Sequence, residues 1–248
     1  MTTSQEPHRI ERSSKEVQVV FGGTYIASTS QPLLVWEQPA KPPQYFLPEA
    51  SLLRDHVQVK PLPNDSASVG NFDHDAVESF ELTAGGKRTV YKAFRAGALE
   101  GHIRLEFAEM DAWLESGALT RLPPKNPSRR IDTALTSTHV IVNIGGAVVA
   151  DARDAVVLYE TGIPPRYYLP ATSVVDWKLL KSSDKLTACP YKGEARYFSV
   201  EVEGKTWEDV AWYYLYPVAE SAAIAGRLAF TVGREGVRIA VDGVEIEK

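Results

Sequence analysis

One stretch of the chain gathers residue types that could do chemistry. Residues 187–195 read Thr-Ala-Cys-Pro-Tyr-Lys-Gly-Glu-Ala, and Tyr197 lies just beyond them. Cys189 is the only cysteine of the protein, and a lysine, a glutamate and two tyrosines follow it closely. A thiol, an amine and a carboxylate so near one another could supply a nucleophile, an acid and a base.

Cys189 has two interpretations. A thiol becomes a nucleophile when a nearby base or cation lowers its pKa below about 8.5, and Lys192 is three residues away. The alternative is a small buried hydrophobic residue before a tight Pro-Tyr turn, which is how most free cysteines behave. His139 is the only histidine in the second half of the chain and is far from Cys189 in sequence. The sequence therefore favours the second interpretation.

Lys192 and Glu194 are separated by one glycine and can project from the same face of a strand or loop. Together they could bind a carboxylate or carbonyl group and move a proton. The alternative is a solvated surface pair of little energetic consequence. A Pro-Tyr-Lys-Gly turn flanked by aromatic residues is unusual for plain surface, so both interpretations stay open. The candidate catalytic residues are Lys192, Glu194, Tyr191 and Cys189.

An internal repeat shows which elements must position these residues. An alternating apolar strand ends at Gly22-Gly23, and the same pattern ends at Gly145-Gly146. In both places two more strands follow, then a glutamate, a Pro-Pro pair and a Tyr-aromatic-Leu-Pro segment. The offset is 123 residues at the glycines (145 − 22) and at Glu37 and Glu160 (160 − 37). A repeat this long indicates two copies of one domain, because solenoid units span only about 20–50 residues.

Each copy consists of short alternating strands separated by Gly, Pro, Asn and Asp, which predicts a mainly β fold of two tandem antiparallel domains. Residues 217–225 begin with Pro and precede Gly226, which predicts a short helix. Residues 109–115 fit a second short helix or a strand end. The expected organisation is a flexible N-terminus (1–15), a first copy (16–120), a Pro-rich linker (121–137) and a second copy (138–248).

The first copy lacks the Cys-Pro-Tyr-Lys-Gly segment, which points to a role in function rather than in folding. Asp73-His74-Asp75 stands near the place where the segment is missing. On a strand the two aspartates would share one face while the histidine points away, so this is a poor metal chelate. We expect no metal site.

Glu160 and Arg166 are candidate ligand-binding residues for different reasons. A carboxylate beside apolar walls can have a raised pKa and act as an acid or base. The alternative is a strand-end glutamate that accepts backbone N–H bonds from the Pro-Pro turn, and the counterpart Glu37 favours that structural role. Arg166 has Gln44 as its counterpart, so it is the better candidate for a function of the second copy, such as bidentate binding of an anion.

The second copy is also rich in tyrosine and tryptophan. Such side chains need a hydrogen-bond partner when buried, so their concentration suits a pocket with a polar mouth. Trp212, Tyr213 and Tyr214 follow one another and cannot all point inward from a strand. Tyr168, Tyr197 and Trp212 complete the candidate ligand-binding set with Glu160 and Arg166.

The second copy resembles the domain of unknown function 427 family over almost its whole length. The matching residues are Gly145-Gly146, Glu-Thr-Gly-Ile-Pro-Pro at 160–165, Tyr-Tyr-Leu-Pro at 167–170, Cys-Pro-Tyr-Lys-Gly-Glu-Ala at 189–195 and Ala211-Trp212. The first copy resembles it more weakly, through Phe-Gly-Gly at 21–23, Pro-Pro at 42–43, Tyr-Phe-Leu-Pro at 45–48 and Met-Asp-Ala-Trp at 110–113. The chain is thus similar to a tandem member of this family.

The resemblance implies a fold similar to the β-tent, in which two small antiparallel sheets meet at an angle. That fold is shared with methionine-R-sulfoxide reductases and with the ligand-binding domain of cereblon. Many β-tent proteins hold zinc with paired Cys-x-x-Cys motifs, which this chain lacks. A nucleotidyltransferase label has circulated for the family, but the chain has no Gly-rich phosphate loop or paired metal-binding aspartates to support it.

Composition narrows the classes of partner. The 248 residues are 44% hydrophobic and 24% charged, as in ordinary globular domains. A net charge of −5 argues against nucleic acid, which needs a basic face. No apolar run approaches the ~20 residues that cross a bilayer, and the polar N-terminus has no apolar signal region. We expect a cytoplasmic protein with no cofactor, no membrane partner and pairing between its two domains.

Three functions remain open. The first is a small-molecule enzyme that uses metal-free acid–base chemistry in an aromatic-lined pocket of the second copy, for isomerisation, elimination, cyclisation or hydrolysis. The second is a non-catalytic module that binds a small molecule, by analogy of fold alone. The third is an interaction scaffold with an exposed aromatic patch.

Overall fold

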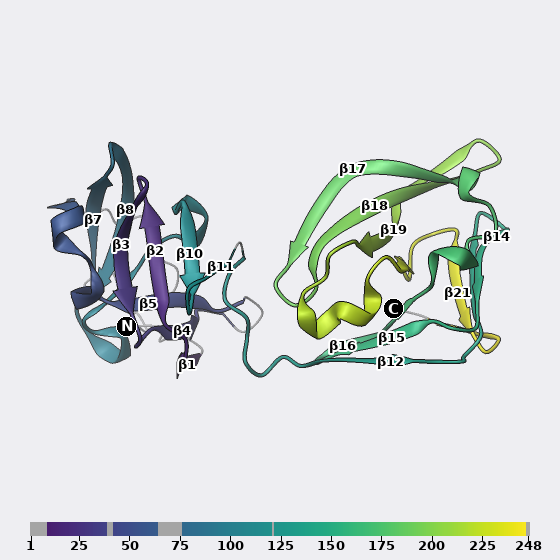
Figure 1. Ribbon diagram of the computed structural model, residues 1–248, viewed down its shortest axis with the longest axis horizontal. Helices are drawn as coiled ribbons and strands as arrows, with labels where there is room; N and C mark the ends of the chain where they lie inside the picture. The colour runs from purple at the N-terminus through teal and green to yellow at the C-terminus, as the bar shows by residue number, and fades with distance from the viewer. Residues whose placement is uncertain (1–8, 39–41, 64–75, 121, 247–248) are drawn as a thin grey trace, which may run out of the picture. The chain divides into compact units, whose positions relative to one another are not determined.

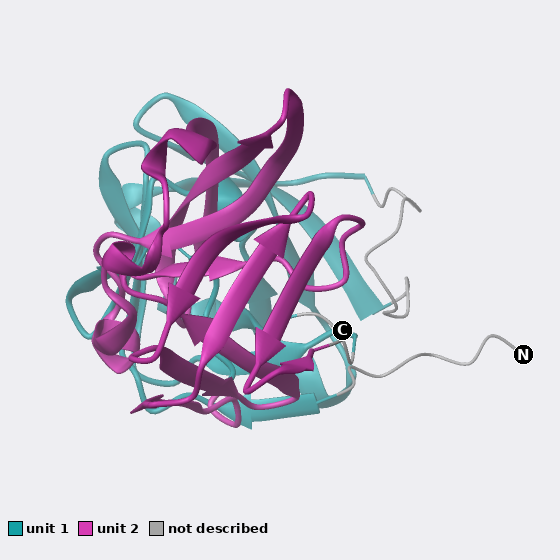
Figure 2. Cartoon of the chain, turned by 90° about the vertical axis from the view of Figure 1, so that its right-hand side faces the viewer, with its two compact units in different colours: residues 1–126 teal, residues 127–248 magenta. Residues whose placement is uncertain are grey.

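The computed structural model describes residues 9–38, 42–63, 76–120 and 122–246. The chain divides into two compact units, unit 1 (residues 1–126) and unit 2 (residues 127–248), shown in different colours in Figure 2. Both consist of antiparallel strands joined by tight turns and short 3-10 helices. The prediction of a mainly β chain with two domains is confirmed. In the part of the chain that is described, no helix is long and apolar enough to span a bilayer.

The described residues of unit 1 form two sheets (Figure 1). Its elements are β1 (Arg9–Arg12), β2 (Val17–Phe21), β3 (Thr24–Thr29), β4 (Leu33–Trp36), β5 (Gln44–Pro48), η1 (Glu49–Ser51), η2 (Arg54–His56), β6 (Gln58–Pro61), β7 (Val77–Ala84), β8 (Lys87–Phe94), η4 (Gly97–Leu99), β9 (His102–Arg104), η5 (Phe107–Glu109), β10 (Ala112–Glu115) and β11 (Ala118–Thr120). The strand orders are β1-β4-β5-β9-β8-β7-β6 and β11-β10-β2-β3.

Residues 127–246 of unit 2 form three sheets. Its elements are β12 (Ile131–Leu135), β13 (Val140–Ile144), β14 (Ala147–Ala152), β15 (Val156–Glu160), β16 (Ile163–Tyr168), η6 (Ala171–Ser173), η7 (Trp177–Leu179), β17 (Leu180–Cys189), β18 (Gly193–Val202), β19 (Lys205–Tyr214), η8 (Ala219–Ile224), β20 (Leu228–Phe230), β21 (Val237–Val241) and β22 (Val244–Glu245). The strand orders are β12-β15-β16, β14-β13-β21-β22 and β17-β18-β19-β20.

The two units share one topology, with one difference that creates room in unit 2. The seven-stranded sheet of unit 1 corresponds to two separate sheets of unit 2. In unit 1, β5 pairs with β9 over three residue pairs. In unit 2 the corresponding strands β16 and β20 meet only at the bridge between Leu169 and Leu228. The sheet β12-β15-β16 and the strands β17, β18 and β19 therefore lie on opposite sides of unit 2 (Figure 1).

Alternation along the strands explains where the cores lie. In β13, Val140, Val142 and Ile144 are buried while the residues between them are partly exposed, as expected for a strand with one buried face. Each unit has a large core and a smaller second cluster. The smaller cluster of unit 1 is aliphatic and phenylalanine-rich: Val35, Phe46, Val77, Phe94 and Leu99. Its counterpart in unit 2 contains tyrosines: Val156, Leu158, Tyr168, Ala195, Tyr214, Ile224 and Ala229.

Two boundaries differ from those expected. Residues 9–12, within the supposedly flexible start, form β1, in which Ile10 pairs with Val35. Residues 131–135, within the supposed linker, form β12, in which Thr133 pairs with Leu158. Each of these strands is the outer strand of its sheet. An outer strand needs only an extended backbone to make its hydrogen bonds, so its composition gave no signal.

The two helix expectations have different outcomes. Residues 217–225 contain the 3-10 helix η8, which is kinked at Ser221. Residues 112–115, which could have been helical, form β10, because Trp113 is buried and pairs with Val19 of β2. This strand corresponds to β21 in the second copy.

Gly145 is a position where the turn requires glycine. Its φ is +62°, and a Cβ there would lie 2.4 Å from the Trp207 ring. Gly146 also has a positive φ, of +89°, but a Cβ there would meet nothing within 4 Å. We expect Gly145→Ala to lower the free energy of unfolding by roughly 2–3 kcal/mol and Gly146→Ala by about 1 kcal/mol. Denaturant unfolding of the full chain measures both. Equal effects would show that the Trp207 contact does not matter.

Candidate functional site

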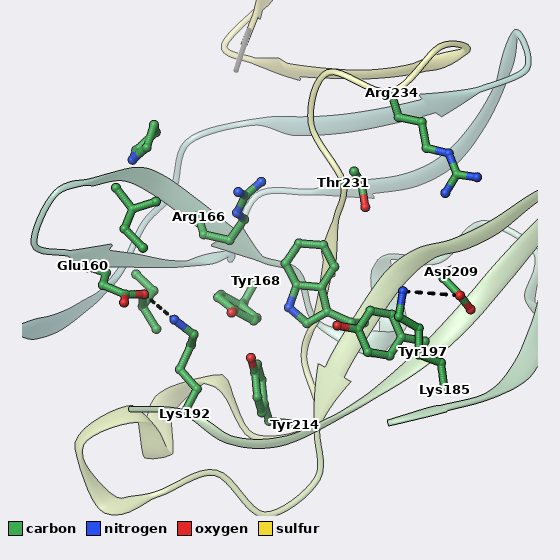
Figure 3. A pocket seen from close by; sticks show the side chains of 14 residues that line it. Glu160, Arg166, Tyr168, Lys185, Lys192, Tyr197, Asp209, Tyr214, Thr231 and Arg234 are labelled. Atoms are coloured by element: carbon green, nitrogen blue, oxygen red, sulfur yellow. Dashed lines mark hydrogen bonds and ion pairs between the residues drawn. The ribbon is translucent and has the colours of Figure 1, made fainter. Parts of the chain in front are cut away.

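A pocket of about 480 Å³ opens in unit 2 between the sheet β12-β15-β16 and the strands β17–β19 (Figure 3). Its walls combine charged and aromatic side chains. The lining residues are Leu158, Glu160, Ile163, Pro164, Arg166, Tyr168, Lys185, Lys192, Tyr197, Asp209, Trp212, Tyr214, Thr231 and Arg234.

A lysine–glutamate pair lies at one end of the pocket. Glu160 is the last residue of β15, and Lys192 belongs to the turn between β17 and β18. The Lys192 ammonium donates a hydrogen bond to Oε2 of Glu160 (Figure 3). The Glu160 side chain is 5% exposed and that of Lys192 is 14% exposed. An acid and a base are thus held together, largely away from water.

The turn that carries Lys192 is fixed by hydrogen bonds from residues beyond β19. Cys189 pairs with Gly193 across the hairpin, and Gly193 has a φ of +103° that reverses the chain. The carbonyl of Lys192 accepts a hydrogen bond from the Val218 N–H (3.2 Å). The carbonyl of Tyr191 accepts one from the Ser221 hydroxyl (2.9 Å). We name this segment, residues 190–192, the pinned turn.

Glu160 has a second cationic partner. Arg129 donates to its other oxygen, Oε1, at 2.8 Å, and the Arg129 guanidinium lies 5.5 Å from the centre of the Tyr191 ring. A buried carboxylate must be compensated in this way, because burying an unpaired charge is costly. The interpretation that Glu160 accepts backbone N–H bonds from the Pro-Pro turn is therefore replaced by one with two side-chain partners.

In unit 1 the charge of the counterpart glutamate is compensated by an arginine on a different strand. Glu37 accepts a hydrogen bond from Arg104 of β9 at 2.5 Å. Arg104 follows Ile103, which pairs with Leu47. In unit 2, Ala229 follows Leu228, which bridges to Leu169. Leu47 and Leu169 are counterparts in the repeat, so Arg104 corresponds to Ala229. The small Ala229 leaves space where Arg104 reaches its glutamate.

Two cations stack on a pair of aromatic rings along the pocket. The Arg166 guanidinium lies 5.5 Å from the centre of the Trp212 ring. The Trp212 and Tyr197 ring centres are 6.5 Å apart, and the Lys185 ammonium lies 4.7 Å from the Tyr197 ring. We name these four residues the cation–aromatic row. Within the described residues, the Arg166 guanidinium has no hydrogen bond or ion pair, so it is available to an anion.

Asp209 lies at the other end of the pocket from Glu160 (Figure 3). It accepts a hydrogen bond from the Ser183 hydroxyl at 2.6 Å and pairs with Lys185 at 3.4 Å. The Ser183 hydrogen bond, with a smaller contribution from Lys185, lowers the pKa of the Asp209 carboxyl. Asp209 is therefore an anion at neutral pH, set beside the cations Lys185 and Arg234.

Two buried tyrosines stand between the charged ends. The rings of Tyr168 and Tyr214 are 6.3 Å apart. Burial raises the pKa of Tyr168 to about 12. Burial also raises the pKa of Tyr214, with a further contribution from Tyr168. Both phenols therefore stay neutral at physiological pH, where they can donate hydrogen bonds.

Alkaline titration tests the state of Tyr168. Its raised pKa means that the neutral phenol is favoured by folding. The stabilisation is complete below the unfolded value of about 10 and is lost as the pH rises through about 12. We expect Tyr168→Phe, which matches Phe46 of unit 1, to remove the phenolate absorbance step near pH 12 and to flatten the loss of stability between pH 10 and 12. Ionisation of Tyr168 near pH 10 in the folded protein would contradict this.

The structure brings together six of the nine residues selected from sequence. Glu160, Arg166, Tyr168, Lys192, Tyr197 and Trp212 line the pocket, while Cys189, Tyr191 and Glu194 do not. Glu194 is exposed and lies 3.8 Å from Arg196. The structure therefore does not bring Lys192 and Glu194 together: the positive φ of Gly193 turns the chain between them.

Cys189 is partly buried at the end of β17, and Tyr191 lies under Arg129. Sequence reasoning did not select Lys185, Asp209, Thr231, Arg234 or Arg129, and it counted Tyr214 only among the aromatics. The sequence did carry one signal for Asp209. Trp212 follows Lys205 by seven residues, whereas its counterpart Lys92 follows Lys87 by five, so the second copy has two additional residues here.

No group of three or more His, Cys, Asp or Glu side chains that could hold a metal ion occurs in the described ranges. Asp73-His74-Asp75 lies outside those ranges. The charged side chains that line the pocket are four cations and two carboxylates: Arg166, Lys185, Lys192, Arg234, Glu160 and Asp209.

Comparison with known proteins agrees with the repeat. A family model with the description "Domain of unknown function (DUF427)" matches the chain twice, over residues 9–115 and 132–244. Each match lies within one structural unit. A search of curated proteins finds no match.

Proposed function

The chain belongs to the DUF427 family, with two copies of its domain, and we propose that the second copy is an enzyme that transfers protons to or from a small organic anion. The observation that carries the proposal is the Lys192–Glu160 pair in the pocket. An ammonium group donates a proton and a carboxylate accepts one, which is the equipment of general acid–base catalysis. The reaction classes that fit are isomerisation, elimination, cyclisation and hydrolysis.

Arg166 supports an anionic substrate. Its guanidinium is held in place by the Trp212 ring and has no carboxylate partner among the described residues. A substrate carboxylate or enolate bound there would lie in the same pocket as the Lys192 ammonium. Cations placed around a developing negative charge lower the barrier to proton abstraction next to a carbonyl group.

Unit 1 provides a comparison within the same chain. Glu37 is paired with Arg104, and an arginine does not lose its proton in proteins. Glu160 is paired with Lys192, and a lysine in a partly buried site can act as a proton donor or base. The first pair can only be structural, whereas the second has a proton that can move. This difference supports a reaction in unit 2 rather than in unit 1.

A second candidate function is a module that binds a small molecule without changing it. It is favoured by Arg129, which together with Lys192 occupies both oxygens of Glu160. Two aromatic rings with a cation on each resemble a binding cage more than a reaction centre. The resemblance to the β-tent fold, some of whose members bind ligands in an aromatic cage, adds an analogy of fold only.

Isotope exchange separates the two candidates without knowledge of the substrate. The full chain is incubated in D₂O with a library of small organic anions, and NMR detects carbon-bound protons that are replaced by deuterium. We expect exchange in at least one bound compound. Lys192→Arg keeps the charge beside Glu160 but not the transferable proton, so it should slow exchange by about 10²–10⁴-fold and leave ligand affinity nearly unchanged.

The matched control is Arg104→Lys in unit 1, which should leave the exchange rate unchanged. Compounds that bind and are neither exchanged nor converted would support the binding module and contradict the enzyme. An exchange rate that Lys192→Arg does not affect would remove Lys192 from the mechanism.

A further inference from the structure

We propose that the ligand of this pocket is an elongated aromatic or conjugated molecule with a negatively charged group at each end. The inference rests on the proposed function in one respect, namely that the pocket takes a small organic anion. Beyond the proposed function, it specifies that the ligand is elongated, that its central part is planar and that it carries a second negative charge.

The cation–aromatic row provides a surface of matching shape. Arg166, Trp212, Tyr197 and Lys185 follow one another in steps of 5.5, 6.5 and 4.7 Å. In Figure 3, Tyr197 lies beside Lys185 and Asp209, and Arg166 lies on the side of Glu160. A flat conjugated ligand can pack against the two rings while its ends reach the two cations, because aromatic faces favour stacked or tilted ring contacts.

Each end of the pocket has more positive than negative charge. At one end, Arg166, Lys192 and Arg129 accompany the single carboxylate of Glu160. At the other end, Lys185 and Arg234 accompany the single carboxylate of Asp209. A neutral ligand would leave this excess uncompensated at both ends, and a monoanion would leave it at one. A dianion places a negative charge at each end.

The second end is built by an irregularity that unit 1 lacks. Trp212 lies seven residues after Lys205 (212 − 205), whereas its counterpart Lys92 lies five residues after Lys87 (92 − 87). The two additional residues form a bulge in β19, where the register shifts opposite Ser199. In unit 1 the corresponding pair β7–β8 keeps its register throughout.

Asp209 occupies this bulge with a φ of +54°, a left-handed conformation that is costly for a residue other than glycine. The backbone N–H of Asp209 donates a hydrogen bond to the Ser199 hydroxyl at 3.1 Å. A second register shift, between Ser183 and Leu186, carries Lys185 on β17, which pairs with β18 on the side away from β19. Bulges re-aim side chains next to active sites, and strain of this kind persists where it serves a function.

Unit 1 lacks the aromatic part of the row as well. Lys92 and Ser79 stand where unit 2 has Trp212 and Tyr197, and they are hydrogen-bonded to each other at 2.7 Å. Gln44 stands in place of Arg166. The row, the bulge and the free guanidinium therefore occur together in one copy, as expected of parts that serve one ligand.

Calorimetric titration of the full chain with matched probes tests the inference. The dianions are terephthalate, biphenyl-4,4′-dicarboxylate and stilbene-4,4′-dicarboxylate, and each is compared with the monocarboxylate of the same skeleton. We expect at least one dicarboxylate to bind about tenfold or more tightly than its monocarboxylate, as a second charge-assisted hydrogen bond would give. The best skeleton reports the distance between the two ends.

Variants assign the two ends. Lys185→Gln should weaken binding of the dicarboxylate much more than that of the monocarboxylate and so remove the advantage, while Lys185→Arg should retain the advantage. Arg166→Gln should weaken both kinds of probe. Lys92→Gln in unit 1 is the matched control and should change neither.

Equal affinities for both members of every probe pair would overturn the inference, as would an advantage that survives Lys185→Gln or a failure of all probes to bind. These results are separable from those for catalysis. Isotope exchange on a monoanion with no dianion advantage would keep the enzyme and remove the second end. A dianion advantage without any exchange would keep the second end and remove the enzyme.

Discussion

Glu160→Gln is expected to lower the free energy of unfolding of the second domain by roughly 3–5 kcal/mol. The change removes the charge between Lys192 and Arg129 while keeping the size of the side chain. Lys192 is only 14% exposed, so its ammonium would remain in a poorly hydrated place with no anion beside it. Breaking one side of a buried pair costs far more than the pair itself contributes.

A double-mutant cycle identifies the cause. Lys192→Met removes the other charge, and we expect Glu160→Gln combined with Lys192→Met to be less destabilising than the sum of the two single changes. The matched pair in unit 1 is Glu37→Gln with Arg104→Met. Its side chains are 16% and 22% exposed, so the same cycle there should give smaller effects.

Hydrogen exchange followed by mass spectrometry on the full chain reports each domain separately. The protection of β15 and β18 should fall in Glu160→Gln and recover in part in the double variant. A loss of less than about 1 kcal/mol, the range of exposed ion pairs, would show that water reaches the pair. Additive effects in the cycle would show that Lys192 and Glu160 are not coupled.

Ala229→Arg is expected to abolish ligand binding by filling the pocket with the chain's own side chain. In unit 1 the residue at this position is Arg104, which donates a hydrogen bond to Glu37, the residue after β4. In unit 2 the buried Ala229 pairs with Trp212 in the middle of the site. A guanidinium there would compete for Glu160 and cover the Trp212 ring. We expect a loss of affinity of at least about 100-fold.

The variant Ala229→Arg with Lys192→Ala reproduces the unit 1 arrangement more closely, because it leaves Glu160 with a single new cation beside Arg129. It should fold better than Ala229→Arg alone and still fail to bind. Arg104→Ala in unit 1 is the control for loss of an arginine and should leave binding unchanged. Probe binding by a folded Ala229→Arg protein at wild-type affinity would place the ligand elsewhere.

The fold could be predicted from the sequence because each strand and turn pattern occurs in both copies of the repeat. The strand before Gly22 and the strand before Gly145 were each short, but their constant spacing identified one domain seen twice. The outer strands β1 and β12 were missed, because an outer strand is held by backbone hydrogen bonds and carries little side-chain pattern. The division of the seven-stranded sheet into two sheets depends on how few residues of β16 and β20 pair, which composition does not encode.

The site was accessible only in part. The Cys-Pro-Tyr-Lys-Gly segment led to Lys192, but the partner nearest in sequence, Glu194, was not its partner in space. The carboxylate that Lys192 contacts is 32 residues away, brought there by the packing of one sheet over another. Lys185 and Asp209 escaped notice because both stand at register shifts, and a register shift changes which face a side chain occupies.

The pinned turn has a consequence for how quickly the pocket can be filled. Because Val218 and Ser221 already hold residues 191 and 192 by their carbonyl groups, the ammonium of Lys192 is in place before anything arrives. A preorganised surface spends little conformational entropy on docking. Association should then proceed in a single step whose rate rises in proportion to ligand concentration, and differences in affinity among related compounds should arise in how long each stays bound.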